Sequence, residues 1–519
     1  MQVVMNIVRS AATVSFYTLL SRILGFVRDL LIATTLGAGP LADAFFTAFR
    51  LPNLFRRLFA EGAFNSAFAP IFAQKLEQDG PDSARNFAQE AFSIVLLVTI
   101  FLTAFAQLIM PGLIVILAPG FLENPVQFEQ TTQMAQLAFP YLGLMTLTAL
   151  AGGVLNGIGR FWAAAAAPIL LNIIMITALV AFANLGKSPG HVLAAAVTVS
   201  GLAQLILVTF AAKKAGYELR LKWPRLTSSV KRLFKLMAPG VLAASTTQIN
   251  IVVGSQLASL LAAGAISHLY YADRLYQLPL GVIGVAIGVA LLPQISRETR
   301  AGNDVSARAT LNRAQELSLW LTLPAAATAI SIPETLVSAL FEHGAFDRAD
   351  ARATALALVA YAAGLPAFVL TKTLVPAFFA REDTKTPAKV AALSVVVNIA
   401  LGLILMWPLG HVGLALATTF SSWLQTILLS RHLMQRGWFT PNKQMLRRII
   451  GMVAASAVMA SAIHFAGPLV LEYSGIIRLF AAIGLCLAGA ILYLILAHLI
   501  GSARIDVAIA EFRGQTSKS

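Results

Sequence analysis

Five arginines lie in an apolar stretch between Ser21 and Pro70, which reads SRILGFVRDLLIATTLGAGPLADAFFTAFRLPNLFRRLFAEGAFNSAFAP. The charged residues of this stretch are Arg22, Arg28, Asp29, Asp43, Arg50, Arg56, Arg57 and Glu61. A charged residue at the centre of a lipid-facing helix costs roughly 2.5–3.5 kcal/mol, so these residues cannot all face lipid. The stretch is therefore expected to line an internal polar cavity.

The excess of arginine over acid points to an anionic ligand for this cavity. Guanidinium groups are planar forks that match phosphate oxygens bidentately. A phosphate or pyrophosphate would supply the counter-charge that three acids do not supply to five arginines. The alternative is that the charges pair among themselves, Arg57 with Glu61 and Asp43 with Arg50, and only stabilise a bend.

Helical periodicity predicts which of the first charges share a face. Arg22 and Asp29 are seven residues apart and share a face of a straight helix, whereas Arg28 points about 120° away from Arg22. Gly25 lies between them and offers a place for the helix to unwind.

The second half of the stretch is harder to phase. On an unbroken helix, four charges fall within about 40° of one line, namely Asp43, Arg50, Arg57 and Glu61. Pro52 interrupts this segment, so the phase beyond it is uncertain. Periodicity therefore leaves open whether Arg56 or Arg57 faces the cavity.

A smaller set of charges follows in the second half of the chain. The segment SHLYYADRLYQLP carries Asp273 and Arg274 next to two tyrosines, and Lys372 comes from a later apolar segment. This half contributes fewer charges, so the anionic part of a ligand is expected to lie nearer the first set.

The composition indicates which elements position these charges. Of 519 residues, 58% are hydrophobic and only 12% are charged, which is typical of an all-α polytopic membrane protein. Fourteen apolar segments are long enough to cross a bilayer. They are approximately 10–36, 41–76, 86–117, 131–158, 162–185, 190–213, 232–263, 267–295, 312–332, 351–380, 387–408, 411–434, 445–468 and 476–501. The second and tenth contain proline and are expected to bend or break.

The distribution of cations predicts the orientation of these spans. Of the 38 Lys and Arg residues, 27 lie on one predicted side of the membrane, 4 lie on the other, and seven lie within the spans. Cytoplasmic loops carry the excess of Lys and Arg, so both termini are predicted to be cytoplasmic. The net charge of +15 therefore reflects membrane topology and does not indicate a nucleic-acid binder.

Three matches at nearly one offset indicate an internal repeat. Pro70 matches Pro293, Tyr141 matches Tyr361, and Asn172 matches Asn398. We predict two six-helix lobes related by a pseudo-two-fold repeat, plus two additional C-terminal helices. The predicted domains are an N-terminal lobe at 1–214, a basic cytoplasmic linker at 215–231, a C-terminal lobe at 232–436, and two last helices with a tail at 437–519.

No motif in the sequence supports an enzyme. The only cysteine, Cys486, lies in an apolar run, the seven histidines have no evident partners, and no phosphate-binding glycine loop is present. We therefore expect no catalytic residues, no metal site and no cofactor, and we expect membrane potential to be the energy source.

Several strings in the chain resemble those of one transporter family. They are SRILGFVRD, LADAFF, RLPNLFRRLFAEGAFNSAFAP, YYADRLYQLP, GVALLP and DTKTP, in this order. In this layout the chain resembles the MurJ (MviN) family of lipid II flippases in the MOP superfamily. The resemblance implies two lobes around a cationic cavity that opens alternately to cytoplasm and periplasm. It also implies that the two last helices form a groove for the undecaprenyl tail.

The resemblance assigns roles to individual residues. It implies that the headgroup is bound by Arg22, Arg28, Arg56 and Arg274, which resolves the choice between Arg56 and Arg57. Asp29, Asp43, Arg50, Glu61, Asp273 and Lys372 would form the supporting charge network, and Ala33 and Ser267 would lie near the periplasmic gate. Gln277 stands where some relatives have Glu, and the regions at 236–263 and 386–436 lack the acids thought to bind sodium in others. Sodium coupling is therefore not expected.

The expected function is transfer of lipid II from the cytoplasmic to the periplasmic leaflet of the bacterial inner membrane. The expected partners are lipid II, membrane lipids and the wall-synthesis machinery, and the expected oligomeric state is a monomer. One alternative is a flippase for another undecaprenyl-linked oligosaccharide. Another is a non-transporting scaffold of wall synthesis, which seven intramembrane cations disfavour because they are costly.

Overall fold

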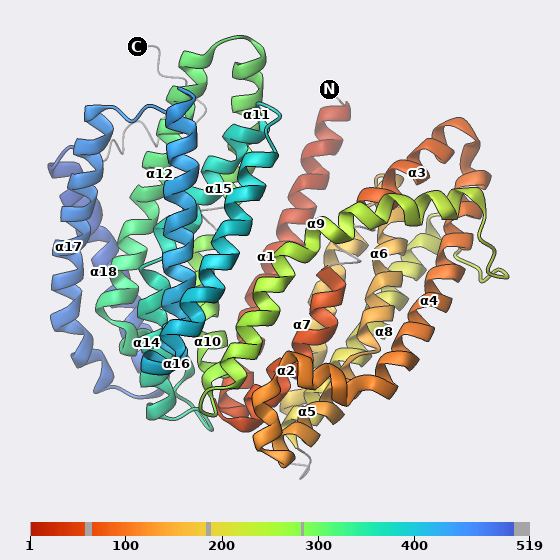
Figure 1. Cartoon of the computed structure of the whole chain (residues 1–519), viewed down its shortest axis with the longest axis horizontal. Helices are drawn as coiled ribbons and strands as arrows, with labels where there is room; N and C mark the ends of the chain where they lie inside the picture. Colours follow the sequence, from red (N-terminus) through yellow and green to blue (C-terminus); the bar gives the residue numbers. More distant parts are fainter. Residues whose placement is uncertain (1, 58–64, 183–187, 282–284, 503–519) are drawn as a thin grey trace. The chain divides into compact units, whose positions relative to one another are not determined.

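The chain folds into helices throughout the part that is described. The computed structural model describes residues 2–57, 65–182, 188–281 and 285–502, and every regular element in these ranges is a helix. Contacts between residues divide the chain into two compact units, Met1–Ser267 and His268–Ser519. The predicted all-α fold is confirmed (Figure 1).

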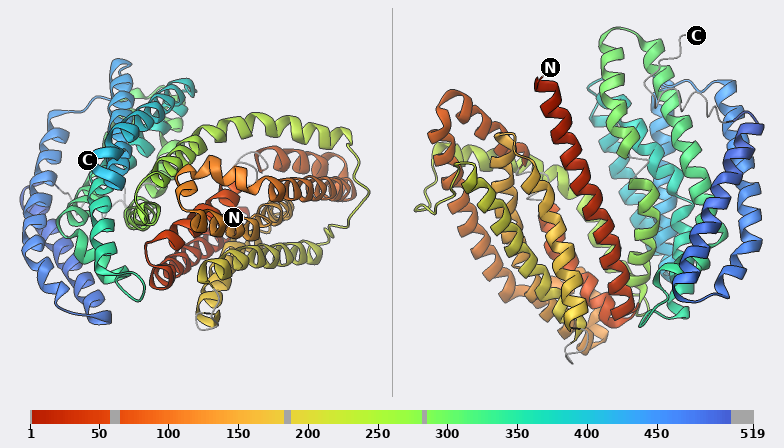
Figure 2. Two further views of the ribbon diagram at one scale, coloured as in Figure 1. Left: turned by 60° about the horizontal axis from the view of Figure 1, so that its bottom comes forward. Right: turned by 180° about the vertical axis from the view of Figure 1, so that it is seen from behind.

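Unit 1 contains the first half of the helices. They are α1 (Gln2–Leu36), α2 (Pro40–Arg56), α3 (Asn65–Gln78), α4 (Gly80–Leu117), the short 3-10 helix η2 (Pro119–Glu123), α5 (Pro125–Ala138), α6 (Tyr141–Gly157), α7 (Trp162–Phe182), α8 (Pro189–Lys214) and α9 (Ser228–Ser259). The N-terminal helix α1 lies along α7, and α7 also packs against α8 (Figure 2). Helix α9, which the sequence assigns to the second lobe, packs against α3 and α4.

Unit 2 contains most of α10 and the helices that follow it. They are α10 (Ala265–Pro279), α11 (Val285–Arg300), α12 (Asp304–Ser331), α13 (Pro333–Phe341), α14 (Arg348–Ala362), α15 (Leu365–Phe379), α16 (Lys385–Gln435), α17 (Lys443–Leu471) and α18 (Gly475–Leu499). Within this unit α12 packs against both α15 and α17, and α17 packs against α18.

The helices are long and apolar enough for a multi-pass membrane protein. Among the described residues, eight helical segments meet the length and hydropathy expected of a membrane span. A ninth is counted if α12 and α13, which meet at 82°, form one bent span. The predicted number of fourteen spans stays a prediction.

One of the breaks predicted from proline is confirmed. The tenth span is divided between α14 and α15, where Pro366 lies in the first turn of α15, whereas Pro52 and Pro376 lie inside α2 and α15 without ending them. The predicted boundary near residue 410 is also confirmed, because Gly410 has a φ of 57° inside the segment assigned as α16.

Other interruptions differ from the sequence prediction. The predicted span 131–158 is divided between α5 and α6 at Pro140, which has no N–H to continue a helix. In contrast, α1 is continuous from Gln2 to Leu36, so the helix does not unwind at Gly25. Gly25 faces the amide of Asn172 in α7, and a Cβ added there would lie 3.6 Å from Asn172 Nδ2, an ordinary van der Waals contact.

The order of elements in the two units agrees with the predicted repeat. Pro70 lies in α3 and Pro293 lies in α11, each within the helix. The interrupted pair α5 and α6 has its counterpart in α14 and α15, and the matched asparagines lie in the next helices, α7 and α16. Each unit therefore contains a broken helix pair at the same place in its sequence order.

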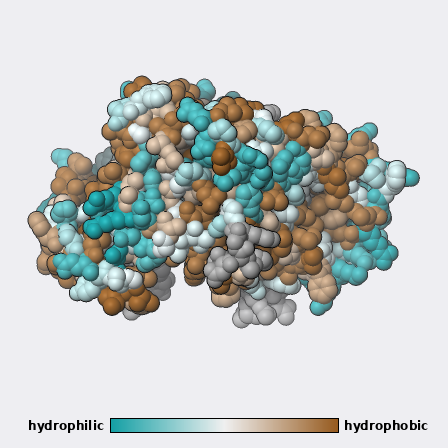
Figure 3. Space-filling model, turned by 90° about the horizontal axis from the view of Figure 1, so that it is seen from below, coloured by the Kyte–Doolittle hydropathy of each residue, from teal (hydrophilic) through white to brown (hydrophobic). Residues whose placement is uncertain are grey.

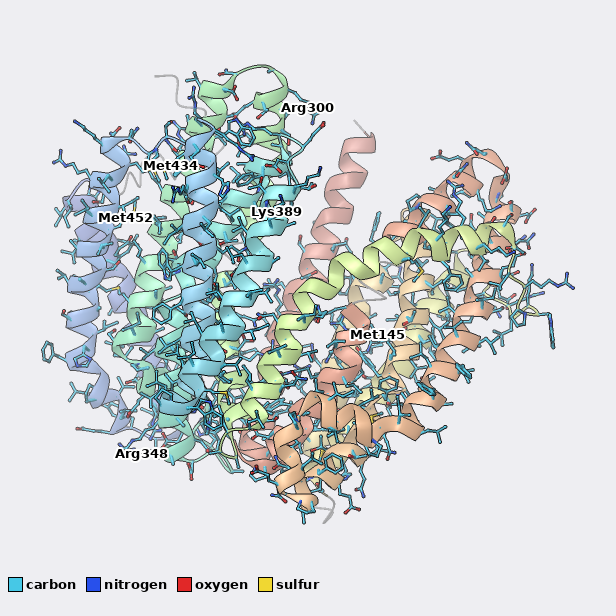
Figure 4. The ribbon with its side chains drawn as sticks, viewed as in Figure 1. Met145, Arg300, Arg348, Lys389, Met434 and Met452 are labelled. Carbon is cyan, nitrogen blue, oxygen red and sulfur yellow. The ribbon has the colours of Figure 1, made fainter. Side chains whose placement is uncertain are left out.

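The ends of unit 2 agree with the predicted distribution of cations. Arg300 and Lys389, which are predicted to be cytoplasmic, lie at one end of the unit, and Arg348 lies at the opposite end (Figure 4).

In a view of the molecule from below, both polar and apolar residues reach the surface (Figure 3).

A cluster of aromatic residues packs one end of unit 1. Phe68 stacks on Phe72 and on Phe87, with ring centroids 5.6 and 5.4 Å apart. All three side chains are almost completely buried, and α3, α4, α6 and α9 contribute to the surrounding core. The cluster holds the α3–α4 hairpin against the rest of the unit.

We predict that Phe87→Ala destabilises unit 1 by about 3–5 kcal/mol, because it leaves a cavity among stacked rings. The expected result is a lower midpoint of thermal unfolding for the purified protein in detergent. Phe101→Ala on the same helix is the matched control, since Phe101 is 73% exposed and should change the midpoint little. Equal midpoints for the two variants would contradict this role of the cluster.

Candidate functional site

Arg28 and Asp29 form a buried ion pair on α1. Nε and Nη2 of Arg28 donate to Oδ1 of Asp29 at 3.0 and 2.6 Å, and the two residues are only 7% and 2% exposed. Nη1 of Arg28 donates to Oδ1 of Asn172 in α7 at 3.0 Å. Breaking such a buried pair by removing one partner costs about 3–5 kcal/mol, because an uncompensated charge is left behind.

Asn172 joins this pair to a residue two turns earlier on α1. Its amide nitrogen donates to the backbone carbonyl of Ser21 at 2.8 Å, while its oxygen accepts from Arg28. Asn172 is itself 4% exposed. The side-chain amide of Asn172 therefore forms hydrogen bonds through both its oxygen and its nitrogen. It orients the plane of the Arg28 guanidinium and holds α1 against α7.

Asp43 makes a second buried network, at the start of α10. Its Oδ2 accepts from the backbone N–H of Gly264 at 2.7 Å, and its Oδ1 accepts from the backbone N–H of Ser267 at 2.8 Å. The Ser267 hydroxyl also donates to Oδ1. A carboxylate at a helix N-terminus satisfies orphan N–H groups and interacts favourably with the helix dipole.

A tight turn between α1 and α2 places Asp43. Helix α1 ends at Leu36, and Gly37 follows with a φ of 66°, a conformation that favours glycine. The N–H of Gly37 donates to the carbonyl of the buried residue Ala33 at 2.8 Å. Pro40 then lies in the first turn of α2, where its missing N–H costs nothing, and Asp43 lies in that same turn.

Arg56 and Arg57 differ in their surroundings at the end of α2. Arg56 is half-buried and its Nε donates to Oδ1 of Asn53 at 3.2 Å, whereas Arg57 is exposed. Arg50 is half-buried and Arg22 is exposed on α1. Glu61 lies outside the described residues. The role of Arg56 in binding a headgroup stays a prediction.

In unit 2, Arg274 packs against an aromatic ring one turn earlier on α10. Its Nη2 donates to the hydroxyl of Tyr270 at 3.0 Å, and its Cζ lies 4.5 Å from the centroid of that ring. Asp273 accepts a hydrogen bond from the side-chain amide of Gln277. Lys372 on α15 is exposed.

The structure thus brings together only some of the predicted site residues. Arg28 joins Asp29, and Asp43 joins Ser267, within unit 1, while Arg274 and Asp273 lie on one helix in unit 2. Among the described residues, no three His, Cys, Asp or Glu side chains gather in a way that would hold a metal ion. The arrangement offers oriented guanidinium groups, which suit an anionic ligand.

Sequence reasoning missed the roles of two residues in these networks. The repeat gives Asn172 no role of its own, although a lone amide in the apolar run PILLNIIM indicates a buried hydrogen-bonding group. The backbone of Gly264 has no sequence signal that connects it to Asp43, which lies 221 residues earlier.

Comparison with known proteins identifies the family. A family model described as lipid II flippase MurJ matches residues 32–483. The chain belongs to the MurJ family. Among its relatives, it is 42% identical to the probable lipid II flippase MurJ of Rhizobium tropici over 97% of this chain and 96% of that protein. It is 35% identical to the lipid II flippase MurJ of Burkholderia cenocepacia over 89% of this chain and 90% of that protein.

Solved structures agree with membership of the MurJ family. A lipid II flippase MurJ in an inward closed conformation is similar with a TM-score of 0.78 and 25% identity, over 94% of this chain and 98% of that one. A multidrug transporter of the MATE family, in the MOP superfamily, is similar with a TM-score of 0.67 and 14% identity, over 80% of this chain and 94% of that one. The second similarity shows a shared fold alone.

We predict that Asp43→Ala exposes the first turn of α10. Two backbone N–H groups lose a charged acceptor, and hydrogen bonds to charged groups contribute about 1.5–3 kcal/mol each. Hydrogen–deuterium exchange measured by mass spectrometry should become roughly tenfold faster or more for the amides at 264–267. Asp43→Asn keeps one acceptor oxygen and should show a smaller increase.

The matched control for this experiment is Asp347→Ala. Asp347 caps α14 by accepting from the N–H of Asp350 at 2.8 Å, so its loss should affect α14 and leave the amides at 264–267 unchanged. Unchanged exchange at 264–267 in Asp43→Ala would show that Asp43 is not the group that stabilises this turn.

Proposed function

We propose that this protein transfers lipid II from the cytoplasmic to the periplasmic leaflet of the bacterial inner membrane by alternating access. The observation that carries the proposal is family membership over nearly the whole chain, because relatives 33–44% identical to it are named lipid II flippases or probable ones. The function is transport, in which no covalent bond of the lipid is made or broken.

The headgroup of lipid II is anionic, and arginines suit its pyrophosphate. The residues proposed to contact the pyrophosphate are Arg22, Arg28, Arg56 and Arg274. The contacts of Arg28 support this role, because Asp29 and Asn172 hold its guanidinium in one orientation before a ligand arrives. A preorganised group loses less conformational entropy on binding than a mobile one.

The burial of Arg28 in an ion pair limits how a ligand can bind to its guanidinium. Arg28 is 7% exposed and already interacts with a carboxylate, so the pyrophosphate has to compete with Asp29 for its donors. Such competition lowers the affinity for the ground state and makes release possible. Arg22 is exposed on the same helix and would meet the ligand without this competition.

The lipid tail is proposed to interact with the last two helices, in the region 437–519. Large apolar side chains are exposed along α18, including Phe480, Leu487 and Ile491, each 58–64% exposed. Within unit 2, a cavity of about 600 Å³ is lined by apolar residues of α17 and α18, such as Met459 and Leu494, together with residues of α10 and α12–α15. An apolar surface of this kind suits a prenyl chain.

The cation distribution supports the proposed orientation and energy source. Both termini are proposed to be cytoplasmic, in accordance with the positive-inside rule. Moving one charge across 100 mV changes the energy by about 2.3 kcal/mol, so the potential can act on the intramembrane arginines. A monomeric state and contact with the wall-synthesis machinery are also proposed.

We predict that Arg28→Ala abolishes translocation, because it removes a donor to the pyrophosphate. Arg28→Lys keeps the charge but loses the planar fork, and it should retain only part of the activity. Translocation is measured in cells that depend on the variant, by the accessibility of lipid II at the periplasmic face. The amount of folded protein is measured in parallel, since both variants remove the two guanidinium hydrogen bonds to Asp29.

Two further variants make this result interpretable. Arg28→Ala/Asp29→Ala removes the pair together, so it should recover folding but not translocation if Arg28 binds the substrate. Arg297→Ala is the matched control, because Arg297 is exposed outside the proposed spans. Normal translocation by a well-folded Arg28→Ala variant would contradict the assignment.

The function itself is tested by depleting the protein from cells. Lipid II should then accumulate in the inner leaflet and lose accessibility from the periplasm. If accessibility does not change, while wall synthesis fails, a scaffold role is supported instead. If another undecaprenyl-linked oligosaccharide accumulates, that lipid is the substrate.

A further inference from the structure

The segment between α8 and α9 is held along the first turns of α4. The backbone N–H of Lys222 donates to the hydroxyl of Ser93 at 2.9 Å, and the amide of Gln89 donates to the carbonyl of Glu218 at 2.7 Å. The hydroxyl of Thr227 donates to the carboxylate of Glu90 at 2.9 Å. These contacts hold residues 218–227, which we call the strap, against one helix.

The same hydrogen bonds determine which side of the strap faces outward. The ammonium of Lys222 donates to Oδ1 of Asn86 in α4 at 2.8 Å, so this side chain points toward the helix. The side chains of its neighbours Leu221 and Trp223 are instead open to the surroundings, at 65% and 82% exposed, and Leu226 is 61% exposed.

Helix α4 indicates the level of the strap relative to the membrane. Its 38 residues extend over ~57 Å, which exceeds a hydrocarbon core of about 30 Å. Exposed large apolar side chains on α4 begin at Leu97 and continue through Phe101 to Leu108. Ser93, which binds the strap, lies one turn before Leu97, and the strap is therefore placed where the hydrocarbon core ends.

The charge around the strap is strongly positive. Residues 213–235 contain eight Lys and Arg and a single acid, Glu218. Hydrogen bonds from Lys213 and Arg220 lower the pKa of Glu218, so this carboxylate is ionised at neutral pH and offsets one charge of this pair. Residues 213–235 therefore keep a large net positive charge, next to the exposed side chain of Trp223.

We propose that the strap is a membrane anchor that binds the anionic phospholipid headgroups of the adjacent leaflet. Trp223, Leu221 and Leu226 insert at the level of the headgroups, where amphipathic rings are favoured. Arg225, which is exposed, contacts lipid phosphates, while Lys222 stays bonded to Asn86 and adds positive charge beside them. The hydrogen bonds to α4 maintain the depth of the segment. A lipid surface is favoured over a protein partner because the strap borders the lipid-facing side of α4.

The proposal is tested with the full chain in nanodiscs of phosphatidylcholine and phosphatidylglycerol. Bromine on the acyl chains quenches nearby tryptophan, and the contribution of Trp223 is the difference between the wild-type protein and Trp223→Phe. At equal bromine content, brominated phosphatidylglycerol should quench Trp223 more strongly than brominated phosphatidylcholine. The readout is lipid contact, so it is independent of whether the proposed flippase function holds.

Charge variants test the role of the cations. Lys222→Gln/Arg225→Gln should lose the preference for phosphatidylglycerol, since each cation near a membrane surface contributes about fivefold, on the order of 25-fold together. Lys443→Gln/Arg447→Gln, which changes two exposed cations of unit 2, is the matched control and should retain it. Equal melting temperatures establish that both variants are folded.

Two results would overturn the proposal. Equal quenching of Trp223 by the two brominated lipids in the wild-type protein would show that the strap does not select anionic lipid. Quenching by iodide in water, without quenching by either lipid, would show that the strap lies outside the membrane interface.

Discussion

The low dielectric of the membrane interior is the constraint on which this structure depends. A charge placed there must be paired and hydrogen-bonded, because desolvation of an isolated ion costs several kcal/mol. Arg28 meets this requirement through Asp29 and Asn172, and Asp43 meets it through backbone N–H groups at the start of α10. In both cases, a hydrogen bond that satisfies the charge also connects helices that are distant in sequence. Asn172 connects α7 to α1, and Asp43 connects α2 to α10.

The same constraint governs where the backbone is irregular. Non-helical backbone at membrane depth is tolerated only where protein or water satisfies its polar groups. The turn at Gly37, which connects two predicted spans, also satisfies its own backbone, because its N–H bonds to the carbonyl of Ala33, and it positions the carboxylate of Asp43 that caps another helix. The interruption between α5 and α6 recurs between α14 and α15, so both halves of the chain use a broken helix at the same place in their order.

Membership of the MurJ family accounts for the presence of charged groups in a largely apolar protein. A flippase has to provide a polar path for a headgroup within an apolar protein, and arginines that are oriented but not permanently neutralised are suited to a pyrophosphate. The cations outside the proposed headgroup path have a different role, at the membrane surface. The basic strap beside α4 illustrates how the cations that establish topology can also contact the membrane surface.

The sequence by itself determined the class of fold, because apolar runs of membrane length and the bias of Lys and Arg are local properties of the chain. It also determined the break near Pro366, where proline restricts the backbone, and the boundary near Gly410, where two apolar segments meet. The family resemblance was likewise carried by local strings. Only the tertiary structure decided that α1 continues through Gly25, that Asn172 orients Arg28, and that Asp43 caps a turn 221 residues away. The physical reason is that hydrogen bonds between distant segments depend on helix packing, and periodicity within one helix has no information about the helix beside it.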